Sequence, residues 1–330
     1  MSGVEMVSVV DADDGLRVDR WFRQHYPQLR HGALEKMLRK GQIRVDGGRV
    51  KASRRVETGE TIRVPPIEDA SVGETKPKPA TGLSADDKNL IRSLVIYEDA
   101  HIIAINKPAG LAVQGGTNTT RHIDGMLGAL SQKQERPRLV HRLDRDTGGV
   151  LLLGRTRKSA KILGEAFARQ QIEKTYWALC FKVPRPPQGT VKMAIAKKMI
   201  RKQEGDYEIV APADGEQGKK AVTDFQLVED AGGKASFVAF RPRTGRTHQI
   251  RVHAAAIGHP IIGDGKYGGT DARLDGVSSM MHLFCRQMIV PNPAGGKPIS
   301  ILAPLADHMA ETWKFFSFDK VADLDWPDTD

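Results

Sequence analysis

The chain has 330 residues, which is enough for two or three domains with at least one large core. No stretch approaches the roughly 18 consecutive apolar residues of a membrane span, and the N-terminus lacks the basic start and apolar segment of a secretory signal. Cys180 and Cys285 are far apart and show no metal-binding spacing, which indicates buried thiols in a reducing compartment. These features predict a soluble, cytoplasmic protein.

The net charge of +10 is distributed unevenly along the chain. Between Gly15 and Pro66 there are 13 Lys and Arg against 5 Asp and Glu, whereas the remaining residues have 37 against 35. A short segment with most of the net charge is typical of a module that binds a polyanion. A basic surface that is merely solvated is the alternative interpretation.

Residues 15–66 show the pattern of a small α/β module. A helix is expected from near Leu16 until Pro27 ends it, and a second from about Gly32 to Arg39. GQIRVDGGRV alternates as a strand and turns at Asp46-Gly47-Gly48, and ETGETIRV predicts a further strand. Two helices and a small sheet with one basic face are therefore expected.

The segments GLRVDRWF, LEKMLRKGQIRVDG and GETIRV resemble the alpha-L RNA-binding domain of a ribosomal small-subunit protein and of several RNA-modifying enzymes. The resemblance implies that residues 15–66 form an RNA-binding domain whose basic side chains face RNA phosphates. The residues expected to make these contacts are Arg30, Lys36, Arg39, Lys40 and Arg44.

Residues 67–89 are rich in Pro, Lys, Ala, Gly, Ser and Asp and predict a linker. SLVIYEDAHIIAINKPAG then predicts two apolar strands around a turn at Glu98–His101. Helices are expected at Ser159–Arg169 and Thr247–Ile257, with strands at TYWALCF, KKAVTDFQLVE and KASFVAFRP. A mixed sheet with inserted helices indicates an α+β domain over residues 90–330.

The segment HRLDRDTGGVLLLGR places charged residues directly before a buried strand. Arg142 and Arg145 could supply the positive charge that keeps Asp144 ionised, which would suit a nucleophile or a general base. From the residues alone, a turn aspartate that bonds its own backbone is the more common role for Asp144. Asp146, followed by Thr147 and Gly148, fits that turn role better.

The segment RPRTGRTHQIRVHAAAIGHPIIGD gathers four arginines and three histidines around one helix start. His248 and Arg251 are three residues apart and share a helix face, and a helix N-terminus favours anions. The histidine spacing argues against zinc and leaves a phosphate-rich ligand as the simpler interpretation. Tyr176 lies in an alternating strand, where a tyrosine more often fills a core.

The segments HRLDRDTGGVLLLGRT, EKTYWAL and TGRTHQIRVHAAAIGHPIIGDGKYGG together resemble the RluA/RluC/RluD-type RNA pseudouridine synthases. KPAGLAVQGGT and GKKAVTDF match further segments, so the resemblance runs from about residue 94 to 290. It implies an α+β catalytic domain with a mainly antiparallel mixed sheet and a central active-site cleft. The implied activity is that of an isomerase that converts uridine to pseudouridine.

The resemblance also implies roles for individual residues. Asp144 matches the catalytic aspartate, Tyr176 the tyrosine that stacks on the base and assists proton transfer, and Arg251 the arginine that pairs with the aspartate. Covalent attack and proton removal both fit Asp144. The residues implied to contact RNA or substrate are Arg142, His141, Arg246, His248 and Gln249. No metal or organic cofactor is expected.

An alpha-L domain before such a catalytic domain is similar to the arrangement in family members that modify ribosomal RNA. The implied partner is large-subunit ribosomal RNA or its assembly intermediates, with no membrane association and a monomeric chain. Two alternatives remain: a transfer RNA pseudouridine synthase of the same family, and a catalytically passive RNA-binding factor in ribosome assembly.

Overall fold

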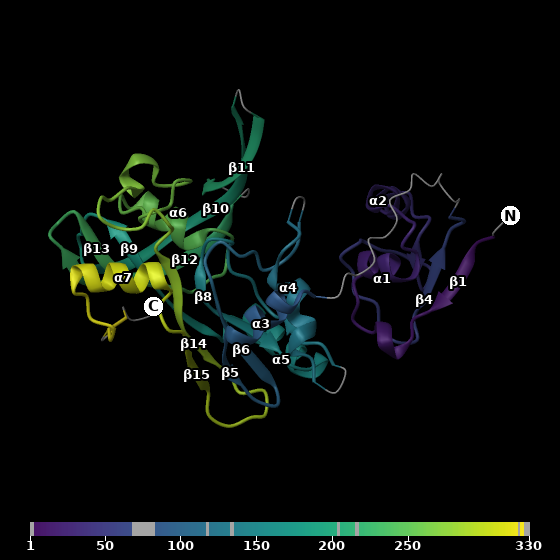
Figure 1. Ribbon diagram of the computed structural model, residues 1–330. Coiled ribbons are helices and arrows are strands. Elements are labelled where there is room, and N and C mark those ends of the chain that lie inside the picture. Colours follow the sequence, from purple (N-terminus) through teal and green to yellow (C-terminus); the bar gives the residue numbers. More distant parts are fainter. Residues whose placement is uncertain are drawn as a thin grey trace. The chain divides into compact units, whose positions relative to one another are not determined.

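The computed structural model forms two compact units, Met1–Thr81 and Gly82–Asp330 (Figure 1). The described residues are 3–67, 83–116, 119–132, 135–202, 205–214, 218–322 and 324–326. Within these ranges no helix is both long enough and apolar enough to cross a bilayer.

The predicted linker, residues 67–89, falls mostly outside the described residues, but its last part differs from the prediction. Ala85–Ser93 form helix α3. The Ser84 hydroxyl accepts a hydrogen bond from the Asp87 N–H at 3.0 Å and caps the helix, and Ile91 is fully buried. The polar composition of the segment gave no indication of this helix, which the buried Ile91 and the Ser84 cap stabilise.

The first unit combines a small antiparallel sheet with two helices, and its core includes Trp21, Phe22 and Ile43. The strand order is β1 (Glu5–Ser8), β4 (Thr61–Val64), β2 (Arg44–Val45), β3 (Gly48–Arg49), and the helices are α1 (Val18–His25) and α2 (His31–Arg39). The predicted helices and hairpin are confirmed. Strand β1 was not predicted, because its mostly exposed side chains give no alternating pattern.

Within its described residues, the second unit contains an 11-stranded sheet in the order β11-β10-β12-β13-β9-β14-β8-β6-β5, with β15 beside β14 and β7 beside β8. Every described pairing is antiparallel except that of β14 with β8. The predicted α+β class with a mainly antiparallel mixed sheet is confirmed. The strands are β5 (Val95–Glu98), β6 (Ile102–Lys107), β7 (Arg138–Leu139), β8 (Gly148–Gly154), β9 (Glu173–Phe181), β10 (Gln188–Lys202), β11 (Gly205–Pro212), β12 (Lys219–Ala231), β13 (Ala235–Pro242), β14 (Leu283–Val290) and β15 (Ile299–Leu302).

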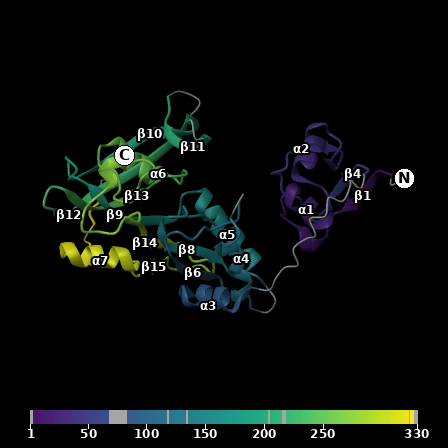
Figure 2. The same ribbon diagram turned by 45° about the horizontal axis from the view of Figure 1, so that its top comes forward.

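Helices cover both faces of this sheet (Figure 2). The register places Trp177 and Phe237 on one face, where the Trp313 ring of α7 stacks on Trp177 at 6.1 Å. Tyr176, one residue earlier on β9, lies on the opposite face, in a pocket that residues of α6 also line. The helices are α4 (Ile123–Met126), α5 (Arg157–Ala168), α6 (Gln249–Ala256) and α7 (Asp307–Phe316).

Strand β8 lies inside the sheet between β6 and β14, and all of its residues are buried, as its apolar run predicts. Its parallel pairing with β14 includes Gly149, which aligns with Cys285. Gly149 has a φ of 104°, and a Cβ atom there would overlap the Cys285 carbonyl group. Only glycine allows the two backbones to approach this closely.

We predict that Gly149→Ala lowers the free energy of unfolding by at least about 2 kcal/mol, because a left-handed alanine and a backbone overlap add together. The control is Gly164→Ala in α5, where a Cβ atom meets nothing within 4 Å. That change should stabilise the helix by up to about 1 kcal/mol. Urea unfolding of both variants measures the difference, and equal stabilities would contradict the close approach.

His141, in the segment before β8, is bonded to the backbone of that strand. Its Nε2 accepts a hydrogen bond from the Leu152 N–H at 2.8 Å, and its ring stacks on Phe167 of α5 at 4.5 Å. Burial, together with the positive charge of Lys174, lowers the pKa of His141 from 6.5 to about 3. The imidazole is therefore neutral in the folded protein at physiological pH.

This depressed pKa predicts an acid-dependent loss of stability. Below pH 6.5 the unfolded chain binds a proton at His141 that the folded chain binds only near pH 3, so stability falls as the pH falls through this range. The loss is about 1.4 kcal/mol per pH unit. His141→Gln, which cannot titrate, should remove one proton from the slope of unfolding free energy against pH. An unchanged slope in urea titrations would show that His141 is protonated in the folded state.

Candidate active site

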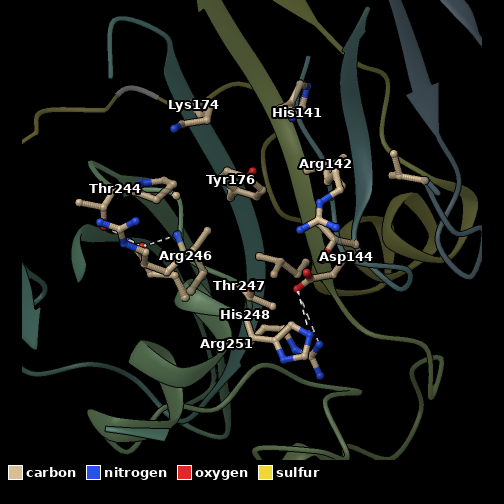
Figure 3. Close-up of a pocket in the computed structure, with 18 of the residues that line it drawn as sticks. His141, Arg142, Asp144, Lys174, Tyr176, Thr244, Arg246, Thr247, His248 and Arg251 are labelled. Atoms are coloured by element: carbon tan, nitrogen blue, oxygen red, sulfur yellow. Dashed lines mark hydrogen bonds and ion pairs between the residues drawn. The ribbon is translucent and has the colours of Figure 1, made fainter. Parts of the chain in front are cut away.

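Three segments that are far apart in sequence meet at a cleft of about 740 Å³ in the second unit (Figure 3). They are the loop before β8, strand β9, and the segment that leads into α6. The lining side chains include His141, Arg142, Asp144, Lys174, Tyr176, Thr244, Arg246, His248 and Arg251. The predicted catalytic residues Asp144, Tyr176 and Arg251 therefore share one cavity.

A tight turn holds Asp144 at the wall of the cleft. The Thr147 N–H donates to the Asp144 carbonyl at 3.2 Å, with Arg145 and Asp146 at the turn positions. Asp146 is thus the turn residue, as predicted. The side chain of Asp144 keeps a quarter of its surface exposed, which makes its carboxylate accessible to a ligand.

A buried lysine anchors the same loop. The Lys107 ammonium donates to the carbonyl oxygens of Pro108, Leu111 and Arg145 at 2.7–2.9 Å, and the side chain is fully buried. Burial lowers the pKa of Lys107 to about 7, and the negative charges of Asp146 and Asp144 oppose that shift. The backbones of Gly110 and Arg145 add a further hydrogen bond of 2.9 Å. The KPAG segment therefore holds the Asp144 loop.

The positive charge beside Asp144 comes from α6. Arg251 Nη1 and His248 Nε2 each lie 3.8 Å from the same carboxylate oxygen, Asp144 Oδ2. The expectation that Arg142 and Arg145 supply this charge is not met. The Arg145 guanidinium donates to the Gly110 carbonyl at 2.9 Å, and Arg142 is exposed at the cleft. Arg145 points away from Asp144 because it is on the turn.

Arg251 is itself fixed by a carboxylate that sequence reasoning missed. Asp264 accepts two parallel hydrogen bonds from Arg251 Nε and Nη2, both of 2.7 Å, and both side chains are buried. Burial alone would lower the pKa of Arg251, but the hydrogen bonds and charge of Asp264 and the charge of Asp144 raise it. The signal available in the sequence was the position of Asp264 in GDGKYGG, at the end of the segment that resembles the pseudouridine synthases.

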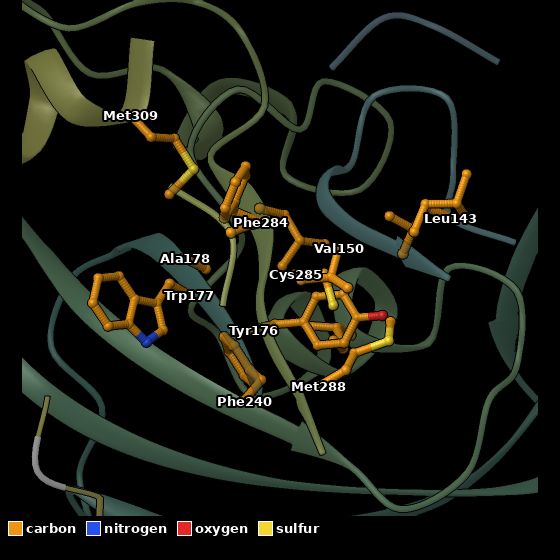
Figure 4. Close-up of a cluster of buried hydrophobic side chains, with 14 of the residues drawn as sticks. Leu143, Val150, Tyr176, Trp177, Ala178, Phe240, Phe284, Cys285, Met288 and Met309 are labelled. Carbon is orange, nitrogen blue, oxygen red and sulfur yellow. The ribbon is translucent and has the colours of Figure 1, made fainter. Parts of the chain in front are cut away.

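Tyr176 lies on β9 with its side chain nearly buried, 9% exposed, beside Val150, Cys285 and Met288 (Figure 4). Burial raises its pKa well above 10, and the neighbouring Cys285 thiol adds to the shift. The phenol is therefore neutral at physiological pH. Lys174, two residues earlier on the same face of β9, also lines the cleft, and burial lowers its pKa. It too was missed.

Two residues expected to contact RNA have structural partners instead. Gln249 is 3% exposed; its amide nitrogen donates to Val222 O and Thr223 Oγ1, and its oxygen accepts from the Thr244 hydroxyl and the Arg246 N–H. All of its hydrogen-bonding capacity is used, because its buried amide ties the loop before α6 to β12. The accepting nitrogen of His141 is occupied by β8.

The other expected contacts remain accessible. Arg246 is exposed at the cleft, and its Nε lies 3.3 Å from the Lys220 carbonyl. In the first unit, the exposed basic residues along α2 and its two ends are Arg30, Lys36, Arg39 and Lys40. Arg44 differs from them, because its guanidinium donates to the Gly41 and Gly47 carbonyls and supports the turn between β2 and β3.

Comparisons with known proteins agree with this arrangement. Residues 101–256 match the family model described as RNA pseudouridylate synthase, a range that includes Asp144, Tyr176 and Arg251. A protein named ribosomal large subunit pseudouridine synthase C from Rickettsia bellii is 34% identical over 304 residues, covering 92% of this chain and 99% of the relative. A protein of the same name from Escherichia coli O157:H7 is 31% identical, covering 93% and 94%.

A solved structure shows the same fold. Human RNA pseudouridylate synthase domain containing 4 superimposes with a TM-score of 0.59 at 25% identity, covering 70% of this chain and 97% of the human one. Sequence and fold thus agree over the unit that contains the cleft. With relatives above 30% identity along nearly their whole length, the chain belongs to the RNA pseudouridylate synthase family.

Proposed function

We propose that this protein isomerises uridines of large-subunit ribosomal RNA to pseudouridine. The observation that carries the proposal is the carboxylate of Asp144, held by Arg251 and His248 at 3.8 Å and open to the cleft. The choice of ribosomal RNA rests on the names of the relatives, which include ribosomal large subunit pseudouridine synthases from Rickettsia bellii and Vibrio cholerae.

The reaction breaks the bond between uracil N1 and the ribose anomeric carbon and joins the base to that carbon through C5. A proton leaves C5 and another is gained at N1, so the reaction is an isomerisation. Asp144 is the group that acts on the ribose, either by attack on the anomeric carbon or by removal of a proton. Arg251 Nη1 and His248 Nε2, each 3.8 Å from its Oδ2, would orient the carboxylate in both cases.

Tyr176 supports the detached base. Because burial holds its pKa well above 10, its hydroxyl stays protonated and is a poor proton acceptor at physiological pH. Its aromatic ring at the cleft wall instead offers a surface on which a uracil can stack. We therefore assign stacking as its main role.

Residues that can contact RNA lie around Asp144, Tyr176 and Arg251. A cleft of about 740 Å³ admits a nucleotide that has left its stack. Arg142, exposed beside Asp144, is placed to fill the gap in the RNA, and Arg246 to contact a phosphate. In the first unit, residues 15–66 serve as an alpha-L RNA-binding domain through the exposed basic residues of α2.

We predict that Asp144→Asn lowers the single-turnover rate of pseudouridine formation by at least about a hundredfold, because the reacting carboxylate is replaced by an amide. RNA affinity should change little. The matched control is Asp146→Asn, which removes an exposed carboxylate two residues away in the same turn and should retain activity. Pseudouridine mapping on purified RNA measures both variants. Full activity of Asp144→Asn would refute the assignment.

The same assay on different RNAs tests the substrate. Modification of large-subunit ribosomal RNA, with transfer RNA left unmodified, supports the proposal. Modification of transfer RNA alone would identify a transfer RNA enzyme of the same family. Binding to ribosomal RNA with no modification of any RNA would indicate a passive assembly factor.

The first unit generates a separate prediction. Replacing Arg30, Lys36, Arg39 and Lys40 together by alanine should weaken RNA binding and reduce the slope of log affinity against log salt by roughly 0.7–0.9 for each phosphate that the variant no longer neutralises. The rate at saturating RNA should stay the same, since Asp144 lies in the other unit. A salt slope equal to that of the unmodified protein would argue against α2 as an RNA-binding surface.

A further inference from the structure

A tyrosine outside the cleft is bonded to the histidine that faces Asp144. Tyr267 Oη lies 2.6 Å from His248 Nδ1, and the two rings meet nearly edge to face at 75°. The Val210 N–H, on β11, donates to the same hydroxyl at 3.1 Å. At the opposite side of the imidazole, His248 Nε2 lies 3.8 Å from Asp144 Oδ2. Hydrogen bonds thus link the backbone of β11 through Tyr267 to the imidazole, and the far nitrogen of the imidazole lies within ion-pair distance of the carboxylate.

The positions of the protons in this chain follow from its donors and acceptors. Burial lowers the pKa of His248 and raises that of Tyr267, so both rings are neutral near neutral pH. The charges that face His248 are Asp144 and Asp264, which oppose its shift, and Arg251 and Lys266, which add to it.

The Val210 N–H occupies one acceptor position of the Tyr267 hydroxyl. Among the described residues, His248 Nδ1 is the side-chain acceptor that this hydroxyl contacts. A phenol that uses its proton to donate to Nδ1 leaves a neutral imidazole with its own proton at Nε2. That N–H is directed at Asp144.

Two nitrogen atoms then lie near a single oxygen of Asp144. Arg251 Nη1 and His248 Nε2 both lie 3.8 Å from Oδ2. His248, the N-cap residue before α6, has a φ of 55°, a left-handed backbone that is unfavourable for a residue with a side chain. The Tyr267 ring also lies 4.9 Å from the Arg251 guanidinium. Tyr267 therefore contacts both groups that hold the carboxylate.

We propose that Tyr267 and His248 are positioning residues for Asp144. Tyr267 fixes the form of His248 that is protonated at Nε2, and His248 and Arg251 together hold Oδ2, so that Oδ1 is the oxygen that acts on the uridine. The assignment rests on the proposed pseudouridine synthase function. It requires no contact between Tyr267 and RNA, and Tyr267 is not among the residues that line the cleft.

Nitrogen NMR of the full chain labelled with ¹⁵N-histidine tests the first step without any measurement of activity. We expect the His248 signals of the unmodified protein to report a proton at Nε2. In Tyr267→Phe, which keeps the ring beside Arg251 but removes the hydroxyl, we expect a shift toward the form protonated at Nδ1. Tyr97→Phe, which removes a hydroxyl bonded to Asp99 at 2.8 Å on β5, is the control and should leave His248 unchanged. An Nδ1 proton in the unmodified protein, or no change in Tyr267→Phe, would overturn the proposal.

A double-substitution cycle tests the effect on the reaction. On transcribed large-subunit ribosomal RNA, Tyr267→Phe should slow the single-turnover rate about tenfold, the effect of one hydrogen bond, with unchanged RNA affinity. His248→Gln presents an amide N–H near the position of Nε2 that needs no tyrosine, so it should retain more activity than His248→Leu. Adding Tyr267→Phe to His248→Gln should then cost less than about twofold.

An equal loss from Tyr267→Phe in both backgrounds would mean that Tyr267 acts through Arg251 or through stability alone. That result would overturn the proposal that Tyr267 positions Asp144 through His248. Failure of the proposed function is a different result. Inactivity of the wild-type protein on every RNA would refute the function. The His248 signals would still decide whether Tyr267 fixes the form of His248 that is protonated at Nε2.

Discussion

The geometry of the cleft depends on the ion pair between Arg251 and Asp264, whose side chains are both buried. An isolated guanidinium in this position would carry a large desolvation penalty, and the two parallel hydrogen bonds to Asp264 offset it. Because Asp264 takes Nε and Nη2, the third nitrogen, Nη1, is directed at Asp144. Asp264 also accepts hydrogen bonds from the Lys266 and Tyr267 N–H groups, which ties the loop after α6 to the arginine. One ion pair thus fixes a helix, a loop and the field at the carboxylate.

The opposite wall of the cleft depends on close backbone packing. The Asp144 loop ends where β8 begins its parallel pairing with β14, and Gly149 permits that approach. Lys107 fills the space beneath the loop with an ammonium group that donates to three carbonyl oxygens. The position of Asp144 therefore depends on groups that do not touch a ligand. The proposed action of this carboxylate on a single ribose carbon would need this degree of fixation.

Charge is distributed in the cleft so that its two functions do not interfere. Burial favours neutral forms of His141, Lys174 and Tyr176, which surround the part suited to an aromatic base. The groups around Asp144 include Arg251 and His248, each 3.8 Å from its Oδ2. An anion and an apolar stacking surface can then lie within one cavity.

Local structure and chemical class could be predicted from the residues alone. The apolar run after Gly149 predicted a strand buried on both faces, and the three-residue spacing of His248 and Arg251 predicted that they share one side, where both lie near Asp144. Such features depend on spacing along a short segment, which is visible in the order of the residues. The motif resemblance identified the family and selected Asp144 over Asp146.

Which groups act on one another depends instead on the tertiary fold. Arg145 is adjacent to Asp144 in sequence but bonds Gly110, whereas Arg251, more than a hundred residues later, faces the carboxylate. Gln249 is in the matched motif, yet its amide is consumed by β12. Asp264 and Tyr267 gain their roles through contacts with α6 that no local pattern encodes. Hydrogen bonds and ion pairs act over a few ångströms in space, and the distance along the chain between partners is set by the fold.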